Sequence, residues 1–242
     1  MTEPADPVPD KCCAALRLSG PARQVHLAVL AAFIADGHPP ASAALDRLAR
    51  AYGGEPGPVR AELAATDVLA FTADREIRAA YPFSAAPTPI RVSWAGGPPV
   101  HAMCAIDALG MSAMLGRPVT IIAAEPGTGR IITVHADGGQ ARWTPRAAVV
   151  FAGAAGEPSC PSADRSCGYI NFFTSARAAR AWARRHPEVT GTVMSRQGAL
   201  HCGIAEFGTL MQAPQPAGPC LGCPGAAAAG VVGGLAGADL GG

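Results

Sequence analysis

The chain has 242 residues, which is long enough to bury a sizeable core as one large domain or two smaller ones. Its 19 basic residues nearly balance its 18 acidic residues, and this net charge of +1 argues against electrostatic binding to nucleic acid or to an anionic membrane. No apolar stretch reaches the roughly 20 residues of a transmembrane helix, and the acidic N-terminus does not resemble a secretory signal. We therefore expect a cytoplasmic protein. Lys11 is its only lysine and its other basic residues are all arginine, a preference that we attribute to coding bias.

The first part of the chain has the pattern of a winged helix-turn-helix unit. Residues 1–20 are polar and rich in proline, so we expect them to form a flexible arm. From residue 21 to residue 83, three segments with helical spacing of apolar residues are followed by two short β-like runs. Such units often bind DNA, but residues 1–83 carry eight basic and ten acidic side chains. Because a phosphate-binding module should be clearly positive, we predict a structural role and no nucleic-acid partner.

After a short linker, residues 90–212 change to β-branched runs that are separated by glycine and proline turns. Strands at hairpin spacing, with helices at intervals, favour an α+β fold with a mixed or antiparallel sheet and flanking helices over a parallel doubly wound sheet. The expected strands are 90–94, 119–124, 131–135, 147–152, 168–173 and 189–194, and the expected helices are 104–115, 175–185 and 200–211.

The last thirty residues, 213–242, contain 21 Ala, Gly or Pro residues. A segment so poor in large side chains cannot form a core, and we expect it to be disordered. It nevertheless holds a Cys-x-x-Cys pair at Cys220 and Cys223.

The eight cysteines are the most informative part of the composition, because thiols stay reduced in the cytosol and there indicate metal binding or thiol chemistry. Buried cysteines that serve only as small apolar side chains are the alternative, above all for Cys202. The cysteines are Cys12, Cys13, Cys104, Cys160, Cys167, Cys202, Cys220 and Cys223.

The segment around Cys104 carries the sharpest pattern. If a helix begins near Cys104, Asp107 lies on the same face one turn later. The unpaired amides and the dipole at a helix N-terminus favour a thiolate, and a carboxyl group at this distance can accept or return a proton. On spacing alone such a pair also arises by chance, so this pattern by itself leaves function open.

The residues that follow resemble a known family. Cys104-Ala-Ile-Asp107-Ala-Leu, with Gly116-Arg-Pro-Val leading into a strand, is similar to the active-site segment of the alkylmercury lyases, also called organomercurial lyases. Their second landmark is a cysteine before a strand that ends in Phe-Phe, followed by a helix with a tryptophan. Here it is Cys167, Phe172-Phe173 and Trp182. The resemblance covers about residues 25–211, and the family shares the winged-helix unit.

The resemblance implies an enzyme that protonates a carbon–mercury bond and releases a hydrocarbon and Hg(II). Cys104 would be the first thiolate, Cys167 the second and Asp107 the proton carrier, with residues 90–212 as the catalytic domain. Mercury(II) is soft and prefers thiolate ligands, so Cys104 and Cys167 would also hold the Hg(II) product, with Asp107 as a candidate third ligand. The family needs no intrinsic cofactor. It implies a low-molecular-weight thiol for product release and a mercuric reductase as acceptor.

Several alternatives stay open. The chain departs from the family at Met103, where an aromatic residue is common, and at Gly168, where some members have a second cysteine. The same cysteines would also suit a non-catalytic metal-binding protein or chaperone, and the winged helix would suit a thiol-based transcriptional sensor. Other cysteine roles are a mercury relay through Cys220 and Cys223 or Cys12 and Cys13, shielding of the site by Cys160, and a zinc site formed by His201, Cys202, Cys220 and Cys223.

Overall fold

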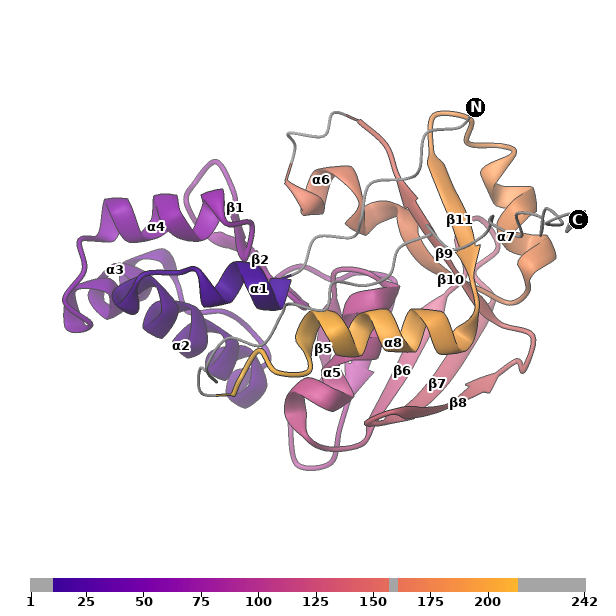
Figure 1. The fold of residues 1–242 in the computed structure, drawn as a ribbon, viewed down its shortest axis with the longest axis horizontal. Coiled ribbons are helices and arrows are strands. Elements are labelled where there is room, and N and C mark those ends of the chain that lie inside the picture. The colour runs from indigo at the N-terminus through magenta and orange to yellow at the C-terminus, as the bar shows by residue number, and fades with distance from the viewer. Residues whose placement is uncertain (1–10, 157–160, 213–242) are drawn as a thin grey trace, which may run out of the picture.

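A computed structural model describes residues 11–156 and 161–212, and two antiparallel sheets form its framework (Figure 1). The larger sheet has eight strands in the order β1-β2-β3-β5-β4-β6-β7-β8, and the smaller has the order β10-β9-β11. Helices α2 to α4 form a separate group at one end, while α5 and α8 lie across the middle of the molecule. The expected α+β class is confirmed.

The N-terminal unit follows the expected order of three helices and a hairpin. Ser19 caps the first of these helices and Gly37 ends it with a φ of 80°, a left-handed conformation that glycine adopts easily. The elements are α2 (Gly20–Asp36), α3 (Ser42–Ala51), α4 (Pro56–Ala65), β1 (Leu69–Phe71) and β2 (Ile77–Ala80).

Two features of this unit differ from the expectation. Residues Lys11–Leu16 form a helix, α1, in the segment expected to be a flexible arm, because this helix packs against α8 and buries the side chain of Lys11. The hairpin also does not stand alone: β2 pairs with β3 (Phe83–Ser84), and β3 pairs with β5. One sheet therefore runs from the N-terminal unit through the expected linker into the rest of the chain.

Alternation of buried and exposed residues builds the remainder of the large sheet. In β6, Val119, Ile121 and Ala123 are buried while Ile122 points to the exposed face, as the period of two in a strand requires. The short strands β5 and β8 alternate in the same way, but they have few apolar residues and the sequence did not predict them. The strands are β4 (Ile90–Ser93), β5 (Val100–Ala102), β6 (Val119–Ala124), β7 (Ile131–Asp137) and β8 (Gln140–Thr144).

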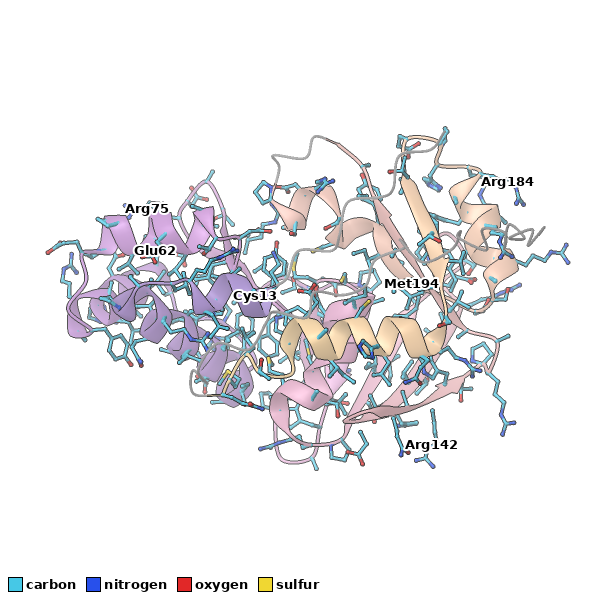
Figure 2. The ribbon with its side chains drawn as sticks, in the orientation of Figure 1. Cys13, Glu62, Arg75, Arg142, Arg184 and Met194 are labelled. Carbon is cyan, nitrogen blue, oxygen red and sulfur yellow. The ribbon has the colours of Figure 1, made fainter. Side chains whose placement is uncertain are left out.

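The smaller sheet is covered by α7, whose buried Trp182 contacts the rings of Phe151 and Phe173. The outer side of α7 is charged, and Figure 2 shows Arg184, which follows this helix, pointing away from the molecule. The elements of this region are β9 (Val149–Ala154), α6 (Ser162–Arg165), a 3-10 turn (Cys167–Tyr169), β10 (Ile170–Phe173), α7 (Ala176–Ala183) and β11 (Thr190–Met194).

Helix α5 (Ala105–Leu115) is packed between the large sheet and α8 (Arg196–Phe207). The two helices cross at a pair of glycines. A Cβ atom on Gly110 would lie 2.3 Å from the carbonyl oxygen of Gly203, and one on Gly203 would lie 2.6 Å from the amide nitrogen of Gly110. This backbone contact leaves no room for a side chain and buries every residue from 105 to 112. Within the part of the chain that the structure describes, no helix is long and apolar enough to cross a membrane.

We expect Gly110→Ala to lower the free energy of unfolding by about 1–3 kcal/mol or more, because the new methyl group must push α8 away from α5. Gly139→Ala is the control: this exposed turn glycine has no atom near the position of a Cβ, so its effect should stay within about 0.5 kcal/mol. Urea unfolding of both variants measures the difference, and equal stabilities would contradict the close helix crossing.

Candidate active site

Cys104 occupies the N-cap position of α5, where β5 turns into the helix. Its backbone is extended, with φ −153° and ψ 179°, and its Sγ accepts a hydrogen bond of 3.4 Å from the backbone N–H of Asp107. This is the capping geometry that serine or threonine usually provides, with sulfur in place of oxygen. It places the thiol and the Asp107 carboxyl group on the same side of the first turn, as the sequence predicted.

Cys167 comes from a different part of the chain. It begins the 3-10 turn that joins α6 to β10, and its side chain lines the same pocket as that of Cys104. Both side chains are buried and are free of disulfide bonds. The structure therefore brings together the three residues Cys104, Asp107 and Cys167 that the sequence singled out.

The three side chains line a small cavity of about 20 Å³, which has room for about one water molecule. Its wall also includes Lys11 from α1, Tyr81 after β2 and Glu206 from α8. No sequence pattern predicted these wall residues, since they lie up to 195 positions apart. The one available signal was that Lys11 is the only lysine of the chain, and the structure buries it at this cavity.

Burial controls the charge of Asp107. Burial raises the pKa of its carboxyl group from 3.8 to about 7. Hydrogen bonding with Cys104 and the nearby charge of Lys11 lower this pKa, but they do not offset the effect of burial. Its Oδ2 is buried and has no hydrogen-bond partner among the described residues. Near neutral pH this carboxyl group is therefore about half protonated, which suits a group that both accepts and donates a proton.

The pKa of the Cys104 thiol is shifted in the direction opposite to the expected one. Burial raises its pKa well above the ordinary value, and hydrogen bonding with Cys167 and the charge of Asp107 raise it further. The hydrogen bond from the Asp107 amide lowers the pKa, but it does not offset the loss of solvation. Cys104 therefore rests as a neutral thiol beside the carboxyl group of Asp107, and its thiolate forms only when a ligand takes the place of the proton.

The remaining predicted residues do not join the site. Cys13 and Cys202 are disulfide-bonded, so neither is the free thiol that a relay or a zinc site needs. Among residues 11–156 and 161–212, no three His, Cys, Asp or Glu side chains are grouped so as to hold a metal ion. The side chain of Cys12, together with Cys160, Cys220 and Cys223, lies outside the described part of the chain.

Comparison with known proteins gives a consistent result. A family model described as alkylmercury lyase matches residues 83–208, more than half of the chain. An alkylmercury lyase from Staphylococcus epidermidis is 28% identical over 123 residues, which are 51% of this chain and 56% of that protein, so the match spans little more than half of this relative. A crystal structure of the mercury-bound form of MerB2 has a TM-score of 0.63 at 25% identity, and the match covers 82% of this chain and 95% of the other.

The raised pKa of Asp107 predicts a pH-dependent stability. Between pH 3.8 and about 7 the folded state keeps a proton that the unfolded state has lost, so the free energy of unfolding falls as the pH rises through this window. One such proton corresponds to about 1.4 kcal/mol per pH unit. His26, whose burial beside Arg23 lowers its pKa to about 3, contributes the opposite slope below pH 6.5.

The Asp107→Asn variant isolates this effect, because His26 is the same in both proteins. We expect the variant to gain stability relative to the wild type from pH 4 to pH 7, by up to about 1.4 kcal/mol per unit, and no further above pH 7. Urea unfolding at a series of pH values measures this gain. A stability difference that does not change with pH would mean that Asp107 has an ordinary pKa.

Proposed function

The chain belongs to the alkylmercury lyase family, and from this we propose that it cleaves the carbon–mercury bond of organomercury compounds by protonation. The observation that carries the proposal is the meeting of two free, buried thiols and one buried carboxyl group at a single small cavity. Thiolate sulfur is the ligand that mercury(II) prefers, and the carboxyl group supplies a proton beside it.

The reaction begins when Cys104 binds the organomercury cation R–Hg⁺ through sulfur and loses its thiol proton. The carboxylate form of Asp107 is the nearest acceptor for this proton, since the two residues are linked across the first turn of α5. Cys167 then adds its sulfur to the metal and loses a proton in turn. The second thiolate increases the electron density on mercury and weakens its bond to carbon.

The carbon–mercury bond breaks when the protonated Asp107 transfers its proton to the departing carbon, which leaves as the hydrocarbon R–H. The two thiols supply two protons in total: one ends on carbon and one reaches the solvent. Mercury leaves the step as Hg(II) bound to Cys104 and Cys167, with no change in oxidation state. Burial of the three residues assists this step, because it keeps bulk water from competing for the proton and for the metal.

Release of the product requires an external ligand, because two thiolates hold Hg(II) tightly. We propose a low-molecular-weight thiol as this ligand and a mercuric reductase as the further acceptor, both in a cytoplasmic setting. The support for both partners is the family resemblance.

We expect Cys104→Ser, Cys167→Ser and Asp107→Asn each to lower the turnover of phenylmercury or methylmercury by at least about 10²-fold, the loss typical for removal of a proton-transfer group. Asp137→Asn is the control, because this carboxyl group is exposed at the end of β7 and should leave turnover unchanged. Gas chromatography of released benzene or methane, with excess thiol present, gives the rates. A wild type that binds mercury tightly and releases no hydrocarbon would instead be a metal-binding protein.

A further inference from the structure

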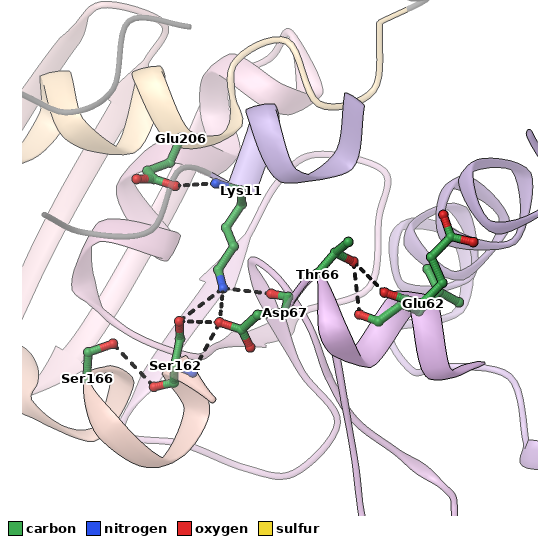
Figure 3. A network of polar contacts seen from close by, with 8 residues as sticks. Lys11, Glu62, Thr66, Asp67, Ser162, Ser166 and Glu206 are labelled. Carbon is green, nitrogen blue, oxygen red and sulfur yellow. Dashed lines mark hydrogen bonds and ion pairs between the residues drawn. The ribbon is translucent and has the colours of Figure 1, made fainter. Parts of the chain in front are cut away.

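Helix α6, which leads into Cys167, is attached to the N-terminal unit through the buried side chain of Lys11 (Figure 3). The ammonium group donates to the backbone oxygen of Asp67 at 2.6 Å, to Oδ2 of Asp67 at 2.5 Å and to Oγ of Ser162 at 3.0 Å. These contacts use all three donors of a lysine. Only 5% of Lys11 is exposed, so this cation is held by its partners and not by solvent.

Asp67 and Ser162 complete the arrangement. Oδ2 of Asp67 also accepts hydrogen bonds from the backbone N–H of Ser162 at 3.1 Å and from its hydroxyl group at 2.5 Å. We call these three residues, Lys11, Asp67 and Ser162, the α6 clamp. It joins α1, the turn that follows α4, and the first residue of α6, which are far apart in the sequence.

Two residues of the α6 clamp, Asp67 and Lys11, are held in place by the elements next to them. Asp67 has a φ of 52°, a left-handed conformation, directly after Thr66, whose hydroxyl donates to carbonyl groups at the end of α4. The backbone N–H of Lys11 donates to Oε2 of Glu206 at 2.8 Å, which ties α1 to α8. The clamp is therefore held by the N-terminal unit and by α8, and α6 is the part that it holds in place.

The two active-site thiols are consequently positioned by different devices. Cys104 belongs to α5, which is packed between the large sheet and α8. Cys167 follows a four-residue helix that is too short to be stable alone. Its link to the clamp runs through Ser166, whose hydroxyl donates to the carbonyl oxygen of Ser162. The ion pair of Arg78 and Asp164 also touches α6, but it is largely exposed and contributes little.

We propose that Lys11, Asp67 and Ser162 are positioning residues that hold Cys167 against Cys104, so that a mercury ion bound to the first sulfur meets the second. The N-terminal unit thereby has a part in the chemistry without touching the substrate through its helices. The effect on turnover rests on the proposed lyase function, whereas the effect on the position of Cys167 does not.

The test compares the reactivity of the two thiols in the full-length protein. Wild type, Lys11→Met, Asp67→Asn and Ser162→Ala are treated with iodoacetamide, and peptide mass mapping follows alkylation of Cys104 and Cys167 separately. We expect each variant to speed alkylation of Cys167 at least tenfold and that of Cys104 by less than twofold. Asp67→Asn retains the left-handed backbone, because asparagine tolerates positive φ, and Ser162→Ala removes a single oxygen. These two variants therefore test the positioning of Cys167 even if Lys11→Met does not fold.

Arg60→Met provides a matched control. Arg60 is also a buried cation of the N-terminal unit, with an ion pair to Asp46 at 2.7 Å and hydrogen bonds to Ser42, but it does not touch α6. Loss of general stability would affect this variant as well, and would expose both cysteines together. We expect Arg60→Met to leave the ratio of Cys167 to Cys104 alkylation unchanged. Equal acceleration of both thiols in the clamp variants, or no acceleration, would overturn the proposal.

A second readout uses inorganic Hg(II) in place of a substrate. Wild type and Arg60→Met should bind one ion with the ultraviolet charge-transfer absorption of a two-thiolate complex, and the clamp variants should reach it at least tenfold more slowly. Hydrocarbon release should fall by a similar factor in the clamp variants alone. If the wild type releases no hydrocarbon, the lyase function fails, while the alkylation and absorption results still decide whether the clamp positions Cys167. Clamp variants that form the two-thiolate complex at the wild-type rate would contradict the proposal.

Discussion

The site depends on the contact between α5 and α8. Glycines at positions 110 and 203 let the two backbones touch, and this contact buries the whole first half of α5 between the sheet and its covering helix. The N-terminus of α5, where Cys104 and Asp107 lie, is therefore removed from water along with the rest of the helix. A surface helix with the same two residues would present an exposed thiol and an ordinary, ionised aspartate.

Removal from water determines the chemistry that the residues can perform. It disfavours every isolated charge, so the thiol of Cys104 rests in its neutral form and the carboxyl group of Asp107 titrates near neutral pH. A soft cation that binds sulfur reverses this balance, because it replaces the thiol proton and supplies the positive charge that a buried thiolate otherwise lacks. In the proposed mechanism the proton displaced in this way passes to Asp107, which then donates it to carbon. One proton would thereby link capture and cleavage.

Much of this could be predicted from the sequence, where local pattern decides the structure. The β-branched run at residues 119–124 gave the bounds of β6 correctly, and the spacing of Cys104 and Asp107 gave their common helix face. Strand β8 was missed because only two of its five residues, Ala141 and Trp143, are apolar. Helix α1 was missed because its stability comes from contact with α8. The thiolate expected at the helix N-terminus was wrong because the helix dipole acts weakly compared with complete burial.

Lys11 shows the limit of such reasoning most clearly. Its three acceptors belong to residues 56 and 151 positions away, and nothing near it in the sequence indicates that it reaches the cavity. Only the fold brings α1, the end of α4 and α6 together. For the same reason the N-terminal unit is not structurally separate from residues 90–212. It contributes strands to the large sheet and the side chain of Tyr81 to the wall of the site.

In the proposed mechanism, Asp107 delivers the proton that separates carbon from mercury after the sulfur atoms have captured both. Mass spectrometry of the intact protein after addition of one equivalent of phenylmercury shows whether this step occurs. We expect the wild type to gain the mass of mercury alone, and Asp107→Asn to gain the mass of mercury together with its phenyl group. A wild type that retains the phenyl group, or an Asp107→Asn variant that loses it at the wild-type rate, would rule out this role for Asp107.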